Sequence, residues 1–183
     1  MAPVVSLRMP LNTLLEEALE AWRYTRAGFI TEIRNLSDED LQVRPSPESR
    51  TAAEVAVHIA ESGLMMAGEL SRPDGNFQRK SFPQFMKEYA RGVRPATTRT
   101  TKKALVQVLT HTHTDGERKL RAAGELHMVQ LINRFDGERG TRLAWMNHGI
   151  SHEEYHRGQI ALYARLVGRV PALTQLIYGI KKT

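Results

Sequence analysis

Apolar residues recur at helical spacing through four long stretches of this 183-residue chain, and no segment carries a convincing strand pattern. Such spacing gathers the apolar side chains on one face of each helix, and that face must be buried against other helices. The sequence therefore predicts an all-α fold, a four-helix bundle that forms a single domain over residues 1–183. The predicted helices cover residues 11–36, 51–70, 98–122 and 141–168.

The ends of the predicted helices carry local signals. Thr51-Ala52-Ala53-Glu54 forms a capping box, in which the threonine hydroxyl and the glutamate carboxylate each accept a hydrogen bond from an exposed backbone amide. Gly168 followed by Pro171 marks the end of the last long helix. The other segments are predicted as an irregular connection over 71–95 with a short helix near 84–89, a loop over 124–140 with a turn at Asp136-Gly137, and a closing helix over 172–178.

Composition narrows the classes of function. The chain has no cysteine, which excludes disulfides, thiolate metal ligands and a cysteine nucleophile. Its 26 Lys+Arg against 20 Asp+Glu give a net charge of +6, but the basic residues are scattered, so we expect no nucleic-acid partner. No apolar run approaches the ~20 residues that cross a bilayer, and the start lacks a signal-peptide pattern. We therefore expect a cytoplasmic protein without a membrane partner.

A pair of histidines, His152 and His156, stands one helical turn apart in the last predicted helix. Residues four apart lie on the same helix face, so the two imidazoles can grip one metal ion. On a helical wheel of about 100° per residue, they share a sector expected to face the bundle interior, while Arg157 is expected to point outward. The same sector also contains Thr141, Trp145, His148, Gln159, Tyr163 and Leu166. Polar side chains in a core are costly unless satisfied, and a metal would satisfy them.

The run from His152 to His156 also matches the H-E-x-x-H pattern of zinc proteases, in which Glu153 would be the general base. The common protease families place a third ligand downstream, but residues 158–183 contain no His, Asp or Glu. The third ligand must therefore lie upstream. His58, in the middle of the second predicted helix, is the best candidate. Three other histidines are less suitable as the third ligand because of their positions: His111, His113 and His127.

The predicted site thus has the metal ligands His58, His152 and His156. Glu153 is kept as a candidate base, and Gln159, one turn after His156, either orients a ligand or fills the core. Glu61 is either a neighbour of the metal or a solvated surface residue. The cations of the long connection either receive an acidic thiol or form a solvated loop: Arg72, Arg79 and Lys80.

Two groups of motifs carry a resemblance to a known family. The first comprises Leu36-Ser37-Asp38-Glu39-Asp40-Leu41 with Arg44-Pro45, then Arg50-Thr51-Ala52-Ala53-Glu54 and His58-Ile59-Ala60. The second is Ser151-His152-Glu153-Glu154-Tyr155-His156-Arg157-Gly158-Gln159-Ile160, followed by Tyr163 to Gly168 and Pro171. The chain resembles the DinB-like family with its YfiT-type metal-dependent members. The resemblance implies a four-helix bundle of unusual helix order, a divalent metal such as nickel or zinc on the same three histidines, and a homodimer.

Three neutral imidazoles leave coordination positions open for water or substrate. Members of the family with known activity include thiol-dependent transferases and a mycothiol-dependent isomerase. We therefore expect a metal-dependent thiol S-transferase that uses a low-molecular-weight thiol. The alternatives are a metal-dependent hydrolase that activates water and a non-catalytic metal-binding stress-response protein. A nucleic-acid accessory protein is a further class, suggested only by the charge and by the damage-inducible name of the family that the chain resembles.

Overall fold

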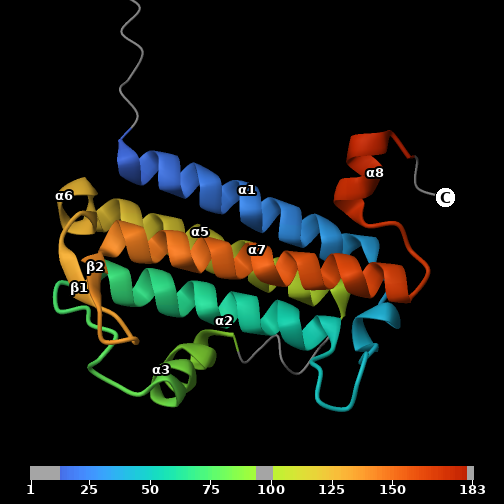
Figure 1. The fold of residues 1–183 in the computed structure, drawn as a ribbon, viewed down its shortest axis with the longest axis horizontal. Helices are drawn as coiled ribbons and strands as arrows, with labels where there is room; N and C mark the ends of the chain where they lie inside the picture. Colours follow the sequence, from blue (N-terminus) through green and yellow to red (C-terminus); the bar gives the residue numbers. More distant parts are fainter. Residues whose placement is uncertain (1–12, 94–100, 181–183) are drawn as a thin grey trace, which may run out of the picture.

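Four long helices build the molecule in a computed structural model that describes residues 13–93 and 101–180 (Figure 1). They are α1 (Leu14–Asn35), α2 (Ala52–Ser71), α5 (Lys102–Ala123) and α7 (Arg142–Leu166). The predicted all-α four-helix bundle is confirmed, and the helix ends agree with the expected ranges to within a few residues. Residues 11, 12 and 98–100, which the prediction placed in helices, lie outside the described residues.

The order of the helices in space differs from that of a simple up-and-down bundle. Helices α1 and α7 lie side by side and run in the same direction, and α2 and α5 form a second parallel pair (Figure 1). Joining two parallel neighbours requires a connection that returns along the whole bundle. Such a connection joins α2 to α5, and its described part, residues 72–93, contains α3 (Phe82–Tyr89) and the 3₁₀ turn η2 (Ala90–Gly92). The length of the predicted irregular connection follows from this topology.

The segment between α5 and α7 is more regular than predicted. It contains the short helix α6 (Glu125–Met128) and a hairpin of β1 (Leu131–Asn133) and β2 (Arg139–Thr141), with Ile132 opposite Gly140. The prediction of a plain loop was wrong here, because three-residue strands are too short to show an alternating pattern. The predicted turn is confirmed, and Gly137 adopts a φ of 85°, a conformation that favours glycine.

Capping fixes where the helices that carry the histidines begin. Thr51 N–H donates to Glu54 Oε2 at 2.8 Å, and Glu54 N–H donates to Thr51 Oγ1 at 3.1 Å, so the predicted capping box is confirmed. At the start of α7, Ala144 N–H donates to the hydroxyl of Thr141 at 3.0 Å. These caps satisfy amides that have no partner within the helix. The last described helix, α8 (Ala172–Tyr178), confirms the closing helix, and η1 (Asp40–Gln42) follows α1.

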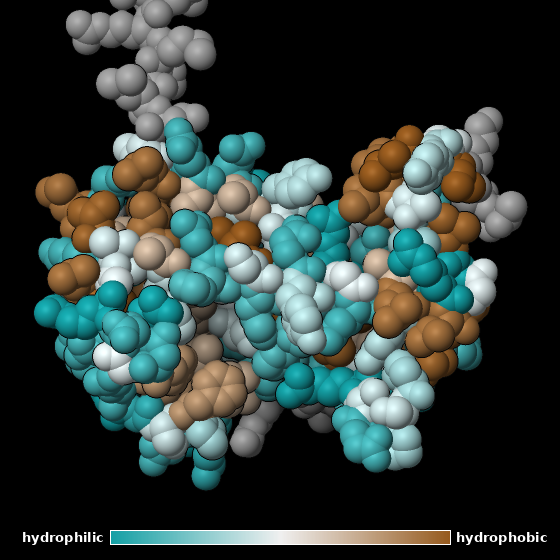
Figure 2. Space-filling view, viewed as in Figure 1, coloured by the Kyte–Doolittle hydropathy of each residue, from teal (hydrophilic) through white to brown (hydrophobic). Residues whose placement is uncertain are grey.

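The core consists of two apolar clusters along the bundle. One surrounds Phe29, Ile59 and Ile160, and the other surrounds Trp22 and Met146. The apolar stripes predicted for α1, α2 and α5 are buried in these clusters. Figure 2 shows that apolar side chains also gather on the surface over α8 and the end of α7. Within the described ranges, none of the helices has both the length and the apolar character to cross a membrane.

Candidate metal centre

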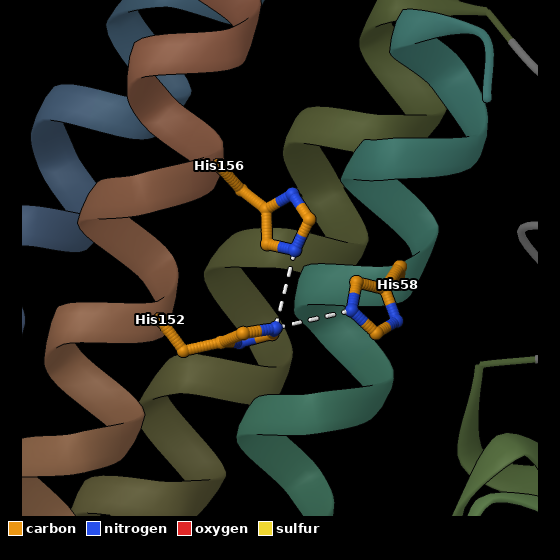
Figure 3. A group of neighbouring side chains, drawn as sticks. All are labelled: His58, His152 and His156. Carbon is orange, nitrogen blue, oxygen red and sulfur yellow. Dashed lines mark hydrogen bonds between the residues drawn. The ribbon is translucent and has the colours of Figure 1, made fainter. Parts of the chain in front are cut away.

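Three imidazole rings converge between α2 and α7. His152 and His156 project from α7, one turn apart, and His58 reaches them from α2 (Figure 3). The Nε2 atom of His152 lies 3.3 Å from Nε2 of His58 and 3.1 Å from Nε2 of His156. One nitrogen from each ring falls within 4.8 Å of the others. The structure therefore brings together the three histidines that the sequence singled out. His58 and His152 are 94 residues apart along the chain.

The environment keeps these rings uncharged. Burial lowers the pKa of His58 to about 3 and that of His152 to about 4. Burial also lowers the pKa of His156, and the positive charge of Arg50 acts in the same direction on all three rings. A neutral imidazole offers a lone pair to a metal, whereas a protonated one does not. At neutral pH the three rings are therefore ready to bind a cation.

The spacing of the nitrogens fits a single divalent ion. Zn–N bonds are about 2.0–2.1 Å long, so two nitrogens at tetrahedral angles around zinc lie about 3.3 Å apart. The distances of 3.1 and 3.3 Å between the Nε2 atoms are close to this value. Imidazole donors suit zinc, nickel, copper and iron. The donor set and its geometry thus fit a divalent metal without identifying it.

Gln159 holds the ring of His156. The Nδ1 atom of His156 lies 2.7 Å from Oε1 of Gln159, and an amide oxygen can only accept, so Nδ1–H donates. The proton on Nδ1 leaves the lone pair of this neutral ring on Nε2, which faces His152. A bond to the second ring nitrogen is the usual way in which proteins orient a metal-binding histidine. Gln159 can therefore orient His156 through the bond to its Nδ1 atom.

Replacing Gln159 with leucine is expected to weaken metal binding by about 10- to 100-fold, because the tautomer and orientation of His156 lose their support. Titration of the metal-free variant with zinc, followed by calorimetry, measures this. Gln107→Leu, on the exposed side of α5, is the matched control and should bind zinc like the unaltered chain. Equal zinc affinity of Gln159→Leu and Gln107→Leu would show that the amide does not orient the ring.

Glu153 lies next to His152 in sequence, but its carboxylate is engaged elsewhere. It accepts hydrogen bonds from Trp22 Nε1 at 3.0 Å and from Arg26 Nη2 at 3.0 Å, and it also pairs with Arg26 Nε. The residues Trp22, Arg26 and Glu153 are all buried. Both carboxylate oxygens thus already have strong donors, an arrangement that suits an anchor between α1 and α7 better than a proton acceptor.

The face that α7 turns to the core differs from the predicted one. Its buried residues are Arg142, Met146, Glu153, His156, Arg157, Ile160, Tyr163 and Ala164. On the helical wheel this face is rotated by roughly 90° from the expected stripe. His148 and Leu166 are exposed, and the histidines line the margin of the core. The prediction failed because four charged or polar side chains are buried on this helix, so apolar spacing does not report its inner face.

Arg157 was predicted to point outward, and this was wrong. Its side chain is buried against α1, where a Cβ on Gly28 would lie 2.4 Å from the guanidinium carbon. The absence of a side chain at Gly28 lets the guanidinium lie flat on the helix. Arg157 also pairs with Glu154 at 3.1 Å and stacks over the ring of Tyr24. Arg157 therefore helps to hold α7 against α1.

Apart from Glu61, which lines a hollow together with His58, the other candidate residues lie apart from the three rings or are already paired. His111 is exposed, His113 packs against Trp22 with ring centroids 4.3 Å apart, and His127 lies 2.8 Å from the carbonyl oxygen of Leu70. The cations proposed for an acidic thiol form ion pairs: Arg72 with Asp74, Arg79 with Glu69, and Lys80 with Glu88. Glu61 is half-buried, and burial raises the pKa of its carboxyl group.

An apolar cavity of about 240 Å³ adjoins the histidines, and the sequence did not reveal it. His58 and His152 form part of its wall. Much of the remainder is aromatic, including Phe77 from the long connection and Phe135 from the turn between β1 and β2. Sequence patterns identify helix faces, but they do not show which loop side chains fold back over a helix. The only local signal was the length of the connection after α2.

The fold and the site thus define a helical-bundle protein with a candidate site for a divalent metal. In this site three neutral histidines converge beside a cavity. A model of the DinB family matches residues 9–180 of the sequence. The chain therefore belongs to the DinB family, as the sequence motifs indicated. No curated protein matches the chain by sequence.

Solved structures share the fold at low sequence identity. YfiT from Bacillus subtilis, described as a probable metal-dependent hydrolase with an unusual four-helix bundle topology, is 14% identical with a TM-score of 0.65, covering 92% of this chain and 94% of that one. A DinB-like protein from Bacillus subtilis is 18% identical with a TM-score of 0.62, covering 84% and 93%. A mycothiol-dependent maleylpyruvate isomerase is 13% identical with a TM-score of 0.61, covering 82% and 63%.

Proposed function

We propose that the chain is a metalloenzyme that holds a divalent metal, nickel or zinc, on His58, His152 and His156 and transfers a low-molecular-weight thiol to an electrophilic carbon. The convergence of three neutral Nε2 atoms at the edge of an apolar cavity carries this proposal. The mycothiol dependence of the isomerase with the same fold supports a thiol as the nucleophile. The absence of cysteine means that a thiol must come from outside the chain.

A divalent cation at this position would lower the pKa of a coordinated thiol, so that the sulfur is a nucleophile at neutral pH. The chain's own residues do the rest. His58, His152 and His156 would hold the metal, His58 and His152 also line the cavity, and Gln159 fixes the ring of His156. Because the carboxylate of Glu153 is fully engaged, we assign it a positioning role and not that of the candidate base.

A second candidate function is a metal-dependent hydrolase. Glu61 favours it, because this half-buried carboxyl group stands one turn after His58 and lines a second hollow together with His58 and Arg50. Burial raises the pKa of Glu61, which moves a carboxylate toward the range of a useful general base. The description of YfiT as a probable metal-dependent hydrolase also supports this alternative.

Conjugate formation separates the two reactions. The zinc- or nickel-loaded protein is incubated with chlorodinitrobenzene and a panel of bacterial thiols, and the products are analysed by mass spectrometry. In the proposed reaction an S–C bond forms, the C–Cl bond breaks, chloride leaves and the thiol proton passes to solvent. We expect conjugate at a rate at least about tenfold above the metal-free protein. Metal-dependent hydrolysis of nitrophenyl acetate without any conjugate would support the hydrolase. If the metal-loaded protein forms neither conjugate nor hydrolysis product, it is a non-catalytic metal-binding protein.

Other expectations stay predictions. A cytoplasmic location suits an enzyme that consumes reduced thiols. We also expect a homodimer, as the resemblance implies, and no nucleic-acid partner. Sedimentation of the purified protein at several concentrations would establish its oligomeric state.

A further inference from the structure

The wall of the cavity beside the histidines is largely aromatic. Three aromatic rings stand together at one side: the centroid of Phe77 lies 4.9 Å from that of Phe135 and 5.6 Å from that of Trp145. Trp22, with Met65 and Met66, lines the cavity as well. The polar groups on the wall are few. Among the described residues that line it, none is a lysine or an arginine.

The single carboxylate on this wall is not available to a ligand. Glu153 is paired with Arg26 and bonded to Trp22, so its charge is already compensated. The other polar side chains on the wall are Ser62, His148 and the two histidines of the centre. A charged ligand group that entered this space would lose its hydration without gaining an opposite charge from the wall. The wall therefore disfavours ionised groups and rewards apolar and aromatic surface.

Size sets a second limit. The cavity volume of about 240 Å³ exceeds the roughly 150 Å³ of an apolar cavity that accepts benzene. One fused pair of aromatic rings, or one ring with a short substituent, is the size that fits. His58 and His152 lie on the wall of this cavity, whereas His156 does not. A ligand in the cavity would therefore lie close to the side of the centre formed by His58 and His152.

We propose that this cavity binds the electrophilic substrate, and that the substrate is an uncharged molecule with an aromatic or compact apolar body. This inference deepens the proposed transferase function and rests on it. Low-molecular-weight thiols carry polar and ionised groups, which the aromatic wall disfavours. The hollow that contains Arg50 and Glu61 is the more polar neighbour of His58, and it suits the thiol better.

Two probes of equal size test the charge selectivity. Neutral naphthalenemethanol and anionic naphthalenesulfonate, a poor metal ligand, are titrated into the zinc-loaded protein, and the fluorescence of Trp22 and Trp145 reports binding. We expect the neutral probe to bind in the micromolar range and the anion at least about tenfold more weakly. Equal binding of both probes, or tighter binding of the anion, would overturn the inference.

Two variants locate the probe. Ser62→Leu places a larger side chain in the cavity and should weaken binding of the neutral probe by at least about tenfold. Phe135→Ala removes part of the aromatic wall and should weaken it by about fivefold, while Leu126→Ala, an exposed apolar residue outside the wall, is the control. Melting temperatures check that each variant is folded. Unchanged binding in folded Ser62→Leu would place the probe elsewhere and overturn the inference.

The outcome is separable from that of the proposed function. Zinc content and conjugate formation are measured on the same samples. If the protein binds the neutral probe in the cavity but forms no conjugate, the transferase function fails while the selectivity of the cavity stands. If it forms conjugate but does not bind the neutral probe, the assignment of the substrate to this cavity fails while the transferase function stands.

Discussion

His152→Ala is expected to lose its metal almost completely. The Nε2 atom of His152 is within 3.3 Å of the nitrogen of each of the other two rings, so it is the link between α2 and α7 at the centre. Without it, two imidazoles on different helices remain, which is too few for a stable zinc site. We expect zinc affinity to fall by at least about 100-fold and conjugate formation to drop to the level of the metal-free protein. Elemental analysis after dialysis and calorimetric titration measure the first effect.

His148→Ala is the matched control, because it removes an imidazole one turn earlier on the same helix. His148 is exposed and packs on Trp145, with ring centroids 4.9 Å apart, and it is not among the three clustered rings. This variant should keep its zinc. Full zinc content in His152→Ala, or an equal loss in both variants, would contradict the assignment of the ligands.

Most of the fold could be predicted because α1, α2 and α5 bury apolar residues at regular spacing. Leu15, Trp22 and Phe29 on α1 are examples, all buried as the periodicity required. The cluster of three histidines could be predicted for a different reason. Histidines are rare enough that a pair at four-residue spacing, with no donor downstream, left few partners upstream. Proximity of His58 then required that α2 and α7 be neighbours, which the bundle allowed.

The parts that escaped prediction depend on contacts between distant segments. The inner face of α7 is set by Glu153 and Arg157, which are both buried against α1. Glu153 pairs with Arg26, and the guanidinium of Arg157 packs against Gly28, where there is no side chain. Arg26 and Glu153 are 127 residues apart, and their individual types give no sign of pairing. The aromatic cavity likewise needs Phe77 and Phe135, from two connections, to meet over α7 near Trp145. Periodicity within one helix cannot report such encounters.

Arg26→Leu is expected to be among the most destabilising single changes in the chain. It leaves Glu153 buried with Trp22 as its remaining side-chain donor. Removal of one partner from a buried ion pair costs about 3–5 kcal/mol, because the other charge stays without compensation. Arg26 also donates to the carbonyl oxygen of Leu109 at 2.7 Å, so α5 loses a contact too. Urea unfolding of the metal-free protein measures the free energy of unfolding, with exposed Arg23→Leu as the control.

The double variant Arg26→Leu with Glu153→Leu shows what the pair does besides stabilising the fold. Replacing both charges with apolar groups should recover most of the lost stability, since no uncompensated charge remains. Glu153 adjoins His152, and its bonds to α1 fix the rotation of α7 that aims His152 at His58. We therefore expect the folded double variant to bind zinc at least about tenfold more weakly than the unaltered chain. If stability recovers and zinc affinity is unchanged, the pair of Arg26 and Glu153 only stabilises the bundle. That result would contradict the positioning role of Glu153.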